Sequence, residues 1–187
     1  MTSIVARAGK RRWCETAAAE RSAAETFLAL FPAARFVCLH RACPDVIYST
    51  LQASPWGLAG PGFAAHTAAH PGSTVAALAA WWVAHAAPVL AFEQDHPQAC
   101  RRVRYEDLAA EPARAERDIL AFLGLDAQAL TLPDLPGDDA PDPAPLAGAD
   151  APGCGADLPA GQIPPQLLAQ VNNLHARLGY PPLQATA

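Results

Sequence analysis

The chain has 187 residues, 51% of them hydrophobic, which is enough for one domain with a sizeable core and too few for two ordinary domains. Its net charge of −5 argues against nucleic acid as the main partner, because binding to a phosphate backbone usually needs a basic surface. The five cysteines form no Cys-x-x-Cys pair, and the basic N-terminus leads into no apolar run. We therefore expect a cytoplasmic protein with reduced thiols and no secretory signal.

The first expected elements are a helix and a short buried strand. Alanines and leucines are frequent in residues 17–31, and Phe27, Leu30 and Phe31 stand at helical spacing, which predicts an amphipathic helix. Pro32 ends that helix. The mostly apolar run from Arg35 to His40 then has the character of a buried parallel strand.

A second helix is expected to begin near Pro44, directly after this strand. Proline suits a first helical turn, and Asp45 places a carboxylate at the positive end of the helix dipole. Arg41 at the end of the strand, Ser49 one turn beyond Asp45 and the free N–H groups of the helix start form a candidate anion site. The alternative open to these residues alone is that Arg41 pairs with Asp45 and Ser49 caps nothing.

Residues 52–72 are expected to form a loop, because glycine and proline interrupt any regular pattern there. Loops beside the ligand-binding edge of an α/β sheet often form the acceptor pocket, so we expect substrate contacts in this segment. His66 and His70 stand four residues apart and could share a metal ion. Because no third ligand lies at a recognisable spacing, we expect no metal site.

A long apolar segment follows from Ser73 to Phe92 and carries no Asp, Glu, Lys or Arg. It is long enough to span a bilayer, so a transmembrane helix must be considered. The segment is dominated by alanine, contains His85 and Pro88 and lacks a clear positive flank, which favours a long core helix and no membrane partner.

A second strand and a well-marked helix are expected next. Charged residues alternate with Val103 and Tyr105 from Arg101 onward, which predicts a strand with one covered face. Glu106 and Asp107 are interpreted as turn and capping residues. Residues 112–123 combine a starting proline, an apolar side and a closing Gly124, and predict a helix.

The last third of the chain changes in character. Residues 126–161 are rich in proline, glycine, alanine and aspartate and contain no lysine or arginine, which predicts an extended acidic linker or loop. Residues 162–180 regain helical spacing after Pro164-Pro165 and end at Gly179, so a final helix is expected to pack back on the domain. The expected division is thus a core over residues 1–125, a linker over 126–161 and a C-terminal helix over 162–187.

Two of these segments, in this order, resemble sulfotransferases that use 3′-phosphoadenosine 5′-phosphosulfate (PAPS), in the bacterial and tyrosylprotein-type branch. The first is the Phe-Pro-x-x-Arg-Phe strand with Arg41, Asp45-Val46 and Ser49, which looks like the segment that binds the 3′-phosphate. The second runs from Arg102 to Leu108 and continues with Glu111-Pro112 and the helix ending at Leu125. The resemblance implies an α/β fold, a three-layer domain similar to P-loop NTPases with a parallel sheet.

The resemblance also implies an activity and three site residues. Arg41 and Ser49 would bind the 3′-phosphate of PAPS, and Tyr105 would lie against adenine, although Tyr105 could also simply anchor its strand. The reaction implied is transfer of a sulfuryl group from PAPS to the hydroxyl of a small-molecule or peptide acceptor, in a bacterial cytoplasm.

Other parts of the family pattern have no evident counterpart. A related enzyme would carry, before the first matched helix, a Gly- and Ser/Thr-containing loop for the 5′-phosphosulfate and the carboxylate that serves as base. Gly9-Lys10 lacks the preceding glycine and the following hydroxyl of such a loop. Thr16 stands where the family commonly has lysine, and Cys43 replaces a proline, so the sequence names no catalytic residue and the core is expected to be N-terminally incomplete.

Three interpretations remain open. The chain could be a sulfotransferase domain that lacks its N-terminal part, a degenerate relative that binds a nucleotide or a protein without catalysis, or an unrelated α/β domain.

Overall fold

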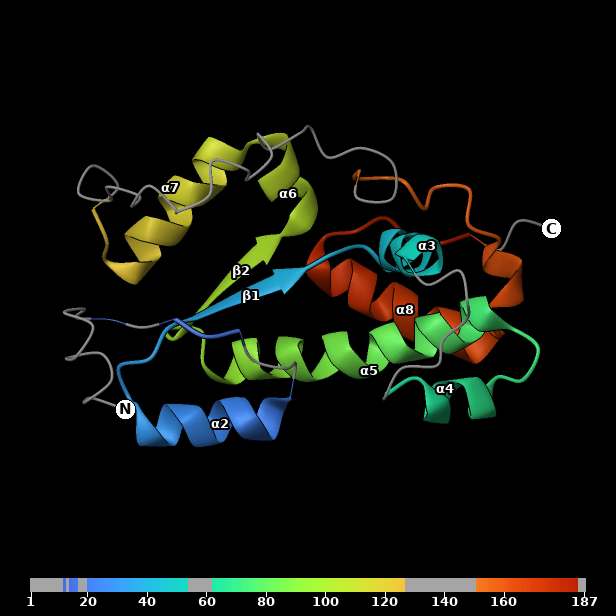
Figure 1. The fold of residues 1–187 in the computed structure, drawn as a ribbon, viewed down its shortest axis with the longest axis horizontal. Coiled ribbons are helices and arrows are strands. Elements are labelled where there is room, and N and C mark those ends of the chain that lie inside the picture. The colour runs from blue at the N-terminus through green and yellow to red at the C-terminus, as the bar shows by residue number, and fades with distance from the viewer. Residues whose placement is uncertain (1–11, 13, 17–19, 54–61, 127–150, 185–187) are drawn as a thin grey trace.

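The computed structural model describes residues 12, 14–16, 20–53, 62–126 and 151–184, and its centre is a pair of parallel strands (Figure 1). Strand β1 (Phe36–His40) pairs with β2 (Cys100–Arg104), with Phe36 opposite Cys100 and His40 opposite Arg104. The two strands therefore end at the same edge. The architecture is α/β with a parallel sheet, as the sequence predicted.

Helices lie on both sides of the strands. Helix α5 (Thr74–Asp95) runs along one side, with α2 (Arg21–Leu30) packed against it, and α6 (Tyr105–Ala110) and α7 (Pro112–Leu123) lie on the other side (Figure 1). The remaining elements are α3 (Cys43–Ala53), α4 (Ala64–Ala69), a 3-10 turn η3 (Ala160–Gln162) and α8 (Pro165–Leu178).

Helix α5 is the core helix of the fold. It packs against α3 and α8, and Leu78 and Leu90 on α5, Ile47 on α3 and Val171 on α8 are fully buried in the shared core. By length and composition α5 could also cross a membrane, but half of its most apolar window is buried inside the protein. Its surface is apolar on all sides because α5 packs against neighbouring elements on several sides.

Several expected elements appear with small shifts in their bounds. The expected helix at residues 17–31 is α2, which begins at Arg21, and the expected strand at 35–40 is β1. The helix expected at residues 112–123 is α7 with the same bounds. The expectation that Tyr105 ends the second strand is wrong, because Tyr105 begins α6.

Two segments expected to be irregular contain packed structure. Helix α4 lies within the expected loop at 52–72, of which residues 54–61 are outside the described part. The expected linker at 126–161 is described only at its two ends, and from Ala151 onward it packs on the start of α3 and leads into η3. The last part of this loop therefore belongs to the body of the domain.

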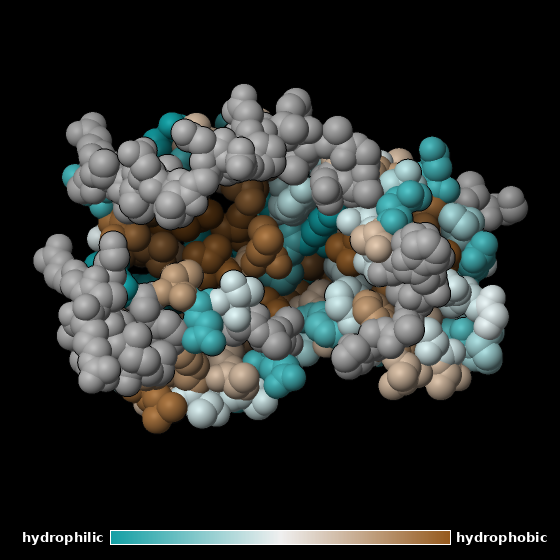
Figure 2. Space-filling model, in the orientation of Figure 1, coloured by the Kyte–Doolittle hydropathy of each residue, from teal (hydrophilic) through white to brown (hydrophobic). Residues whose placement is uncertain are grey.

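The strand face turned away from α5 carries exposed apolar side chains. On β1, Cys38 and His40 are buried, whereas Val37 and Leu39 are 41% and 56% exposed. Figure 2 shows apolar surface in a hollow over this part of the molecule. Parallel sheets usually have both faces covered, so this degree of exposure is uncommon for the class.

Candidate functional site

The candidate site lies where the two parallel strands end. Arg41 follows β1 and Tyr105 follows β2, and the last residues of the strands, His40 and Arg104, are paired. The Cζ atom of Arg41 lies 4.4 Å from the centre of the Tyr105 ring. Such a cation–π contact contributes about 0.5–2 kcal/mol, depending on solvent exposure. The structure thus brings together two of the three residues predicted for the site.

The third predicted residue, Ser49, lies deeper on α3. It is half-buried and stands one turn beyond Asp45, which places both side chains on the same face of the helix. Within the described part of the chain, no hydrogen bond joins its hydroxyl to Arg41 or Tyr105. Ser49 therefore remains a candidate for phosphate binding only because it lies on the same face of α3 as Asp45.

The backbone between Arg41 and Cys43 is held by three side chains from other elements. The indole N–H of Trp82 on α5 donates to the carbonyl of Arg41 at 3.1 Å. The amide of Ala42 donates to Oε1 of Glu106 at 2.9 Å, and the amide of Cys43 donates to Nε2 of His175 at 3.2 Å. The expectation of free N–H groups at this helix start is therefore wrong for these two amides, because protein acceptors already engage them.

His175 is held as a neutral ring. Its Nδ1 lies 2.7 Å from the carbonyl of Pro181, which is an acceptor, while its Nε2 accepts from the amide of Cys43. These partners assign the proton to Nδ1. Burial lowers the pKa of His175, which further favours the neutral form.

The segment from Ala151 to Leu158 packs on the start of α3. Both carboxylate oxygens of Asp45 accept backbone N–H groups, from Gly153 at 2.6 Å and Gly155 at 2.9 Å. Gly155 approaches so closely that a Cβ atom there would lie 2.2 Å from the carbonyl carbon and oxygen of Pro44. A larger residue at this position would force the segment away from α3.

Cys154 is the residue through which this segment contacts the candidate site. Nη2 of Arg41 lies 3.5 Å from the Cys154 sulfur and 3.5 Å from the carbonyl of Ala151. Burial and the nearby carboxylate of Asp45 raise the pKa of Cys154, so the thiol is protonated at neutral pH. The sequence analysis missed these residues; the closely spaced glycines, Gly153 and Gly155, were the signal for a tight backbone approach.

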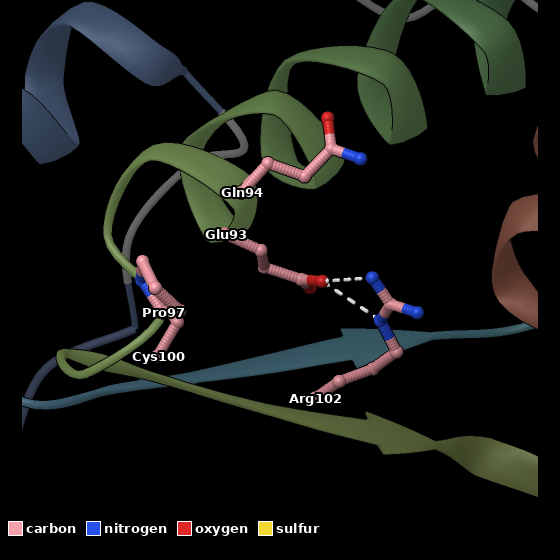
Figure 3. Close-up of a pocket in the computed structure, with 5 residues that line it drawn as sticks. All are labelled: Glu93, Gln94, Pro97, Cys100 and Arg102. Atoms are coloured by element: carbon pink, nitrogen blue, oxygen red, sulfur yellow. Dashed lines mark hydrogen bonds and ion pairs between the residues drawn. The ribbon is translucent and has the colours of Figure 1, made fainter.

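A second polar cluster ties both strands to α5, and Figure 3 shows the part of it formed by Glu93 and Arg102. The buried carboxylate of Glu93 contacts Nε2 of His40 on β1 at 2.6 Å and Nε of Arg102 on β2 at 2.7 Å. A shallow surface pocket of about 210 Å³ lies beside it, lined also by Gln94, Pro97 and Cys100. Burial alone would raise the pKa of Glu93, but the hydrogen bonds from His40 and Arg102 lower it, so the carboxylate stays charged.

Parts of the family pattern fall on residues about which the structure says little. Gly9-Lys10 lies outside the described residues, and Thr16, at the position where a lysine was expected, is exposed. Within the described residues, the arrangement at the strand ends includes the guanidinium of Arg41 and the aromatic face of Tyr105, with the hydroxyl of Ser49 further along α3. That set suits an anionic group attached to a flat ring.

Comparisons with known proteins point in one direction. A family model described as "Sulfotransferase family" matches residues 2–129. Among solved structures, the "Sulfotransferase Domain from the Curacin Biosynthetic Pathway" is similar with a TM-score of 0.56 and 19% identity, over 87% of this chain and 59% of that chain. The chain thus spans less than two thirds of that domain. No curated protein matches.

Proposed function

This chain belongs to the sulfotransferase family, and from that premise we propose that it binds PAPS by its 3′ side, with Arg41 on the 3′-phosphate and Tyr105 against adenine. Family and fold support a sulfotransferase-type function, and the family membership removes the interpretation as an unrelated α/β domain. The observation that carries the proposal is the stack of Arg41 on Tyr105 at the edge where both strands end.

The residues of the site fit the 3′ side of such a nucleotide. Arg41 offers a planar fork of donors suited to a phosphate, and the ring of Tyr105 offers a face on which a base can stack. The amides of Ala42 and Cys43 are engaged by Glu106 and His175, so recognition of the phosphate falls on side chains, Arg41 first and Ser49 second. When bound, PAPS supplies the activated sulfuryl group.

The acceptor in this proposal is a hydroxyl of a small molecule or a peptide. Transfer needs a base that removes the proton of the hydroxyl and cations or N–H groups that stabilise charge on the sulfuryl oxygens. In this proposal the described residues bind the nucleotide. None of them is assigned as the general base. We place substrate contacts in the segment around α4, which follows the same edge of the sheet.

A second function is supported by a specific observation. Thr16 provides no cation for the transferring group, and the described residues include no assigned base. A relative that binds the nucleotide without turning it over is consistent with both facts. Binding and turnover must therefore be measured separately.

The test uses the whole chain with two ligands. Titration calorimetry with 3′,5′-phosphoadenosine measures binding, and mass spectrometry of products from PAPS and a panel of phenols, alcohols and tyrosine peptides measures transfer. Binding with transfer supports the enzyme, and binding without transfer supports the non-catalytic relative. A folded chain that binds neither nucleotide would contradict both.

A further inference from the structure

Glu106 joins three elements at the candidate site. Its Oε1 accepts the amide of Ala42 at 2.9 Å, and its Oε2 accepts the hydroxyl of Tyr180 at 2.9 Å. The guanidinium of Arg104 lies further off, with Nε 3.9 Å from Oε2. The carboxylate thus bridges the loop after β1 and Tyr180, which lies just beyond the C-cap of α8.

The bond from Ala42 acts on Arg41 because both belong to one peptide group. That peptide unit consists of the carbonyl of Arg41 and the amide of Ala42. Trp82 donates to its oxygen, and Glu106 accepts from its N–H. Because a peptide unit is planar, holding both ends fixes its orientation, and with it the backbone dihedrals on either side. The direction in which the Arg41 side chain leaves the backbone depends on these dihedrals.

Glu106 also directly follows the residue that receives the guanidinium. Tyr105 lies under the guanidinium of Arg41, and Glu106 accepts the amide of Ala42, which belongs to the same peptide group as the carbonyl of Arg41. Two successive residues of α6 therefore contact the side chain of Arg41 and the peptide group that joins Arg41 to Ala42. A residue that only capped α6 would accept an amide of that helix. The carboxylate of Glu106 instead accepts the amide of Ala42, in the loop after β1.

Tyr180 supports the carboxylate from the far side. Helix α8 ends at Leu178 and is capped by Gly179, whose left-handed φ of +80° turns the chain so that Tyr180 faces Glu106. Burial and the nearby carboxylate raise the pKa of Tyr180, so its hydroxyl remains a donor. The guanidinium of Arg104 stacks on the Tyr180 ring at 4.5 Å.

We propose that Glu106 is a positioning residue for nucleotide binding: by accepting the Ala42 amide it sets the peptide of Arg41, so that the guanidinium meets the 3′-phosphate. This inference rests on the proposed function, and it assigns to Glu106 a role beyond turn formation. The role requires a hydrogen-bond acceptor at this position. It does not depend on the negative charge of the carboxylate.

The test compares replacements that keep or remove that acceptor. Glu106→Gln keeps an oxygen for the Ala42 amide, and its NH2 can donate to the oxygen of Tyr180. Glu106→Ala removes the acceptor, and Glu106→Asp keeps the charge on a side chain one methylene shorter. Asp107→Ala is the matched control, because Asp107 is an exposed acid in the same first turn of α6.

The first readout needs no ligand. Amide hydrogen exchange by NMR should show a protected Ala42 in the wild type, in Glu106→Gln and in Asp107→Ala. In Glu106→Ala and Glu106→Asp we expect Ala42 to exchange at least about tenfold faster than in the wild type, while amides of α5 keep their protection. The ring-current shift of the Arg41 side chain over Tyr105 should shrink in the same two variants.

The second readout separates positioning from general damage. The ligand 5′-AMP lacks the 3′-phosphate, so the ratio of its dissociation constant to that of 3′,5′-phosphoadenosine measures what Arg41 contributes. Glu106→Ala should lower this ratio about tenfold, and Glu106→Gln should leave it within about twofold of the wild type. A purely structural role would weaken both ligands equally and leave the ratio unchanged.

The outcomes are distinct. If the Ala42 amide and the Arg41 shift are unchanged in both Glu106→Ala and Glu106→Asp, the positioning role is overturned whether or not the nucleotide binds. If the wild type binds no nucleotide, the proposed function fails, and the exchange data alone decide whether Glu106 sets Arg41. Should Glu106→Ala not fold, the comparison of Glu106→Gln with Glu106→Asp gives the same decision.

Discussion

At the scale of single residues, the aromatic face of Tyr105 should matter more than its hydroxyl. The ring already holds the Arg41 guanidinium at 4.4 Å and is proposed to stack on adenine. Replacing Tyr105 with Phe keeps the ring and should change affinity for 3′,5′-phosphoadenosine by less than about threefold. Tyr105→Ala removes stacking and should weaken binding about tenfold or more. Equal losses in the two variants, measured by calorimetry, would assign the role to the hydroxyl instead.

Gly155 is the residue whose replacement should loosen the segment over α3. A Cβ atom there would lie 2.2 Å from backbone atoms of Pro44, so Gly155→Ala must push the segment outward. We expect a loss of about 1–3 kcal/mol in the free energy of unfolding and a melting temperature lower by several degrees. Ala156→Ser, at the exposed neighbouring position, is the control. A melting temperature unchanged in Gly155→Ala would mean that the segment is not packed here.

Some residues near the site could be assigned to it from the sequence, and others could not. Arg41 was expected at the end of the first strand and Tyr105 at the end of the second, and because parallel strands end at one edge, the two could be predicted to lie close together although Tyr105 begins α6. Glu106 was assigned to a turn, and His175 received no role, because their partners Ala42 and Cys43 are 64 and 132 residues away in the chain. No local pattern encodes such pairs, since they depend on how α6 and α8 pack against the loop after β1.

At the scale of elements, helix α8 should give the protein a pH-dependent stability. The pKa of His175 is lowered in the folded state from its ordinary value of 6.5, so the unfolded chain takes up the proton first. The free energy of unfolding should therefore be constant above about pH 7 and fall as the pH drops below 6.5 toward the lower folded-state pKa. Urea unfolding at pH values between about 7.5 and 5.5 measures this.

The variant His175→Gln isolates that effect. Because glutamine does not titrate, the slope of unfolding free energy with pH should be shallower in this range, even if the variant is less stable throughout. Glu93 does not contribute to this slope between pH 7.5 and about 5.5. Its pKa is lowered from 4.5, so its contribution to stability is lost only at more acidic pH. A wild-type stability that stays flat from pH 7.5 to about 5.5 would contradict the assignment of a neutral His175.

Elements with strong local signals were predicted well, and short or irregular ones were not. Helix α7 has a starting proline, an apolar side and a closing Gly124, and its bounds match the prediction. The helices α4 and α6 have six residues each, too few to show a helical repeat. Residues 151–158 have the composition of a linker, and their place on α3 comes from the contacts of Asp45 with Gly153 and Gly155.

At the scale of the whole molecule, the chain builds a sulfotransferase fold around one apolar helix. Helix α5 packs on both strands and on α3 and α8, so its sequence resembles a membrane span while its packing is that of a core helix. The cluster of Glu93 with His40 and Arg102 fixes the carboxyl-terminal half of α5 to both strands. The chain spans 59% of the similar sulfotransferase domain, so transfer activity is a separate question from nucleotide binding.

Calorimetric titration of Arg41→Ala with 3′,5′-phosphoadenosine, beside the wild type and Arg114→Ala, tests the central claim most directly. Arg114 is an exposed arginine on α7, paired with Glu111, and serves as the matched loss of charge. The account predicts binding by the wild type and by Arg114→Ala, and a loss of about 10- to 100-fold in Arg41→Ala, which corresponds to one charge-assisted contact. Equal affinity of Arg41→Ala and the wild type would show that the phosphate is bound elsewhere and would contradict the site.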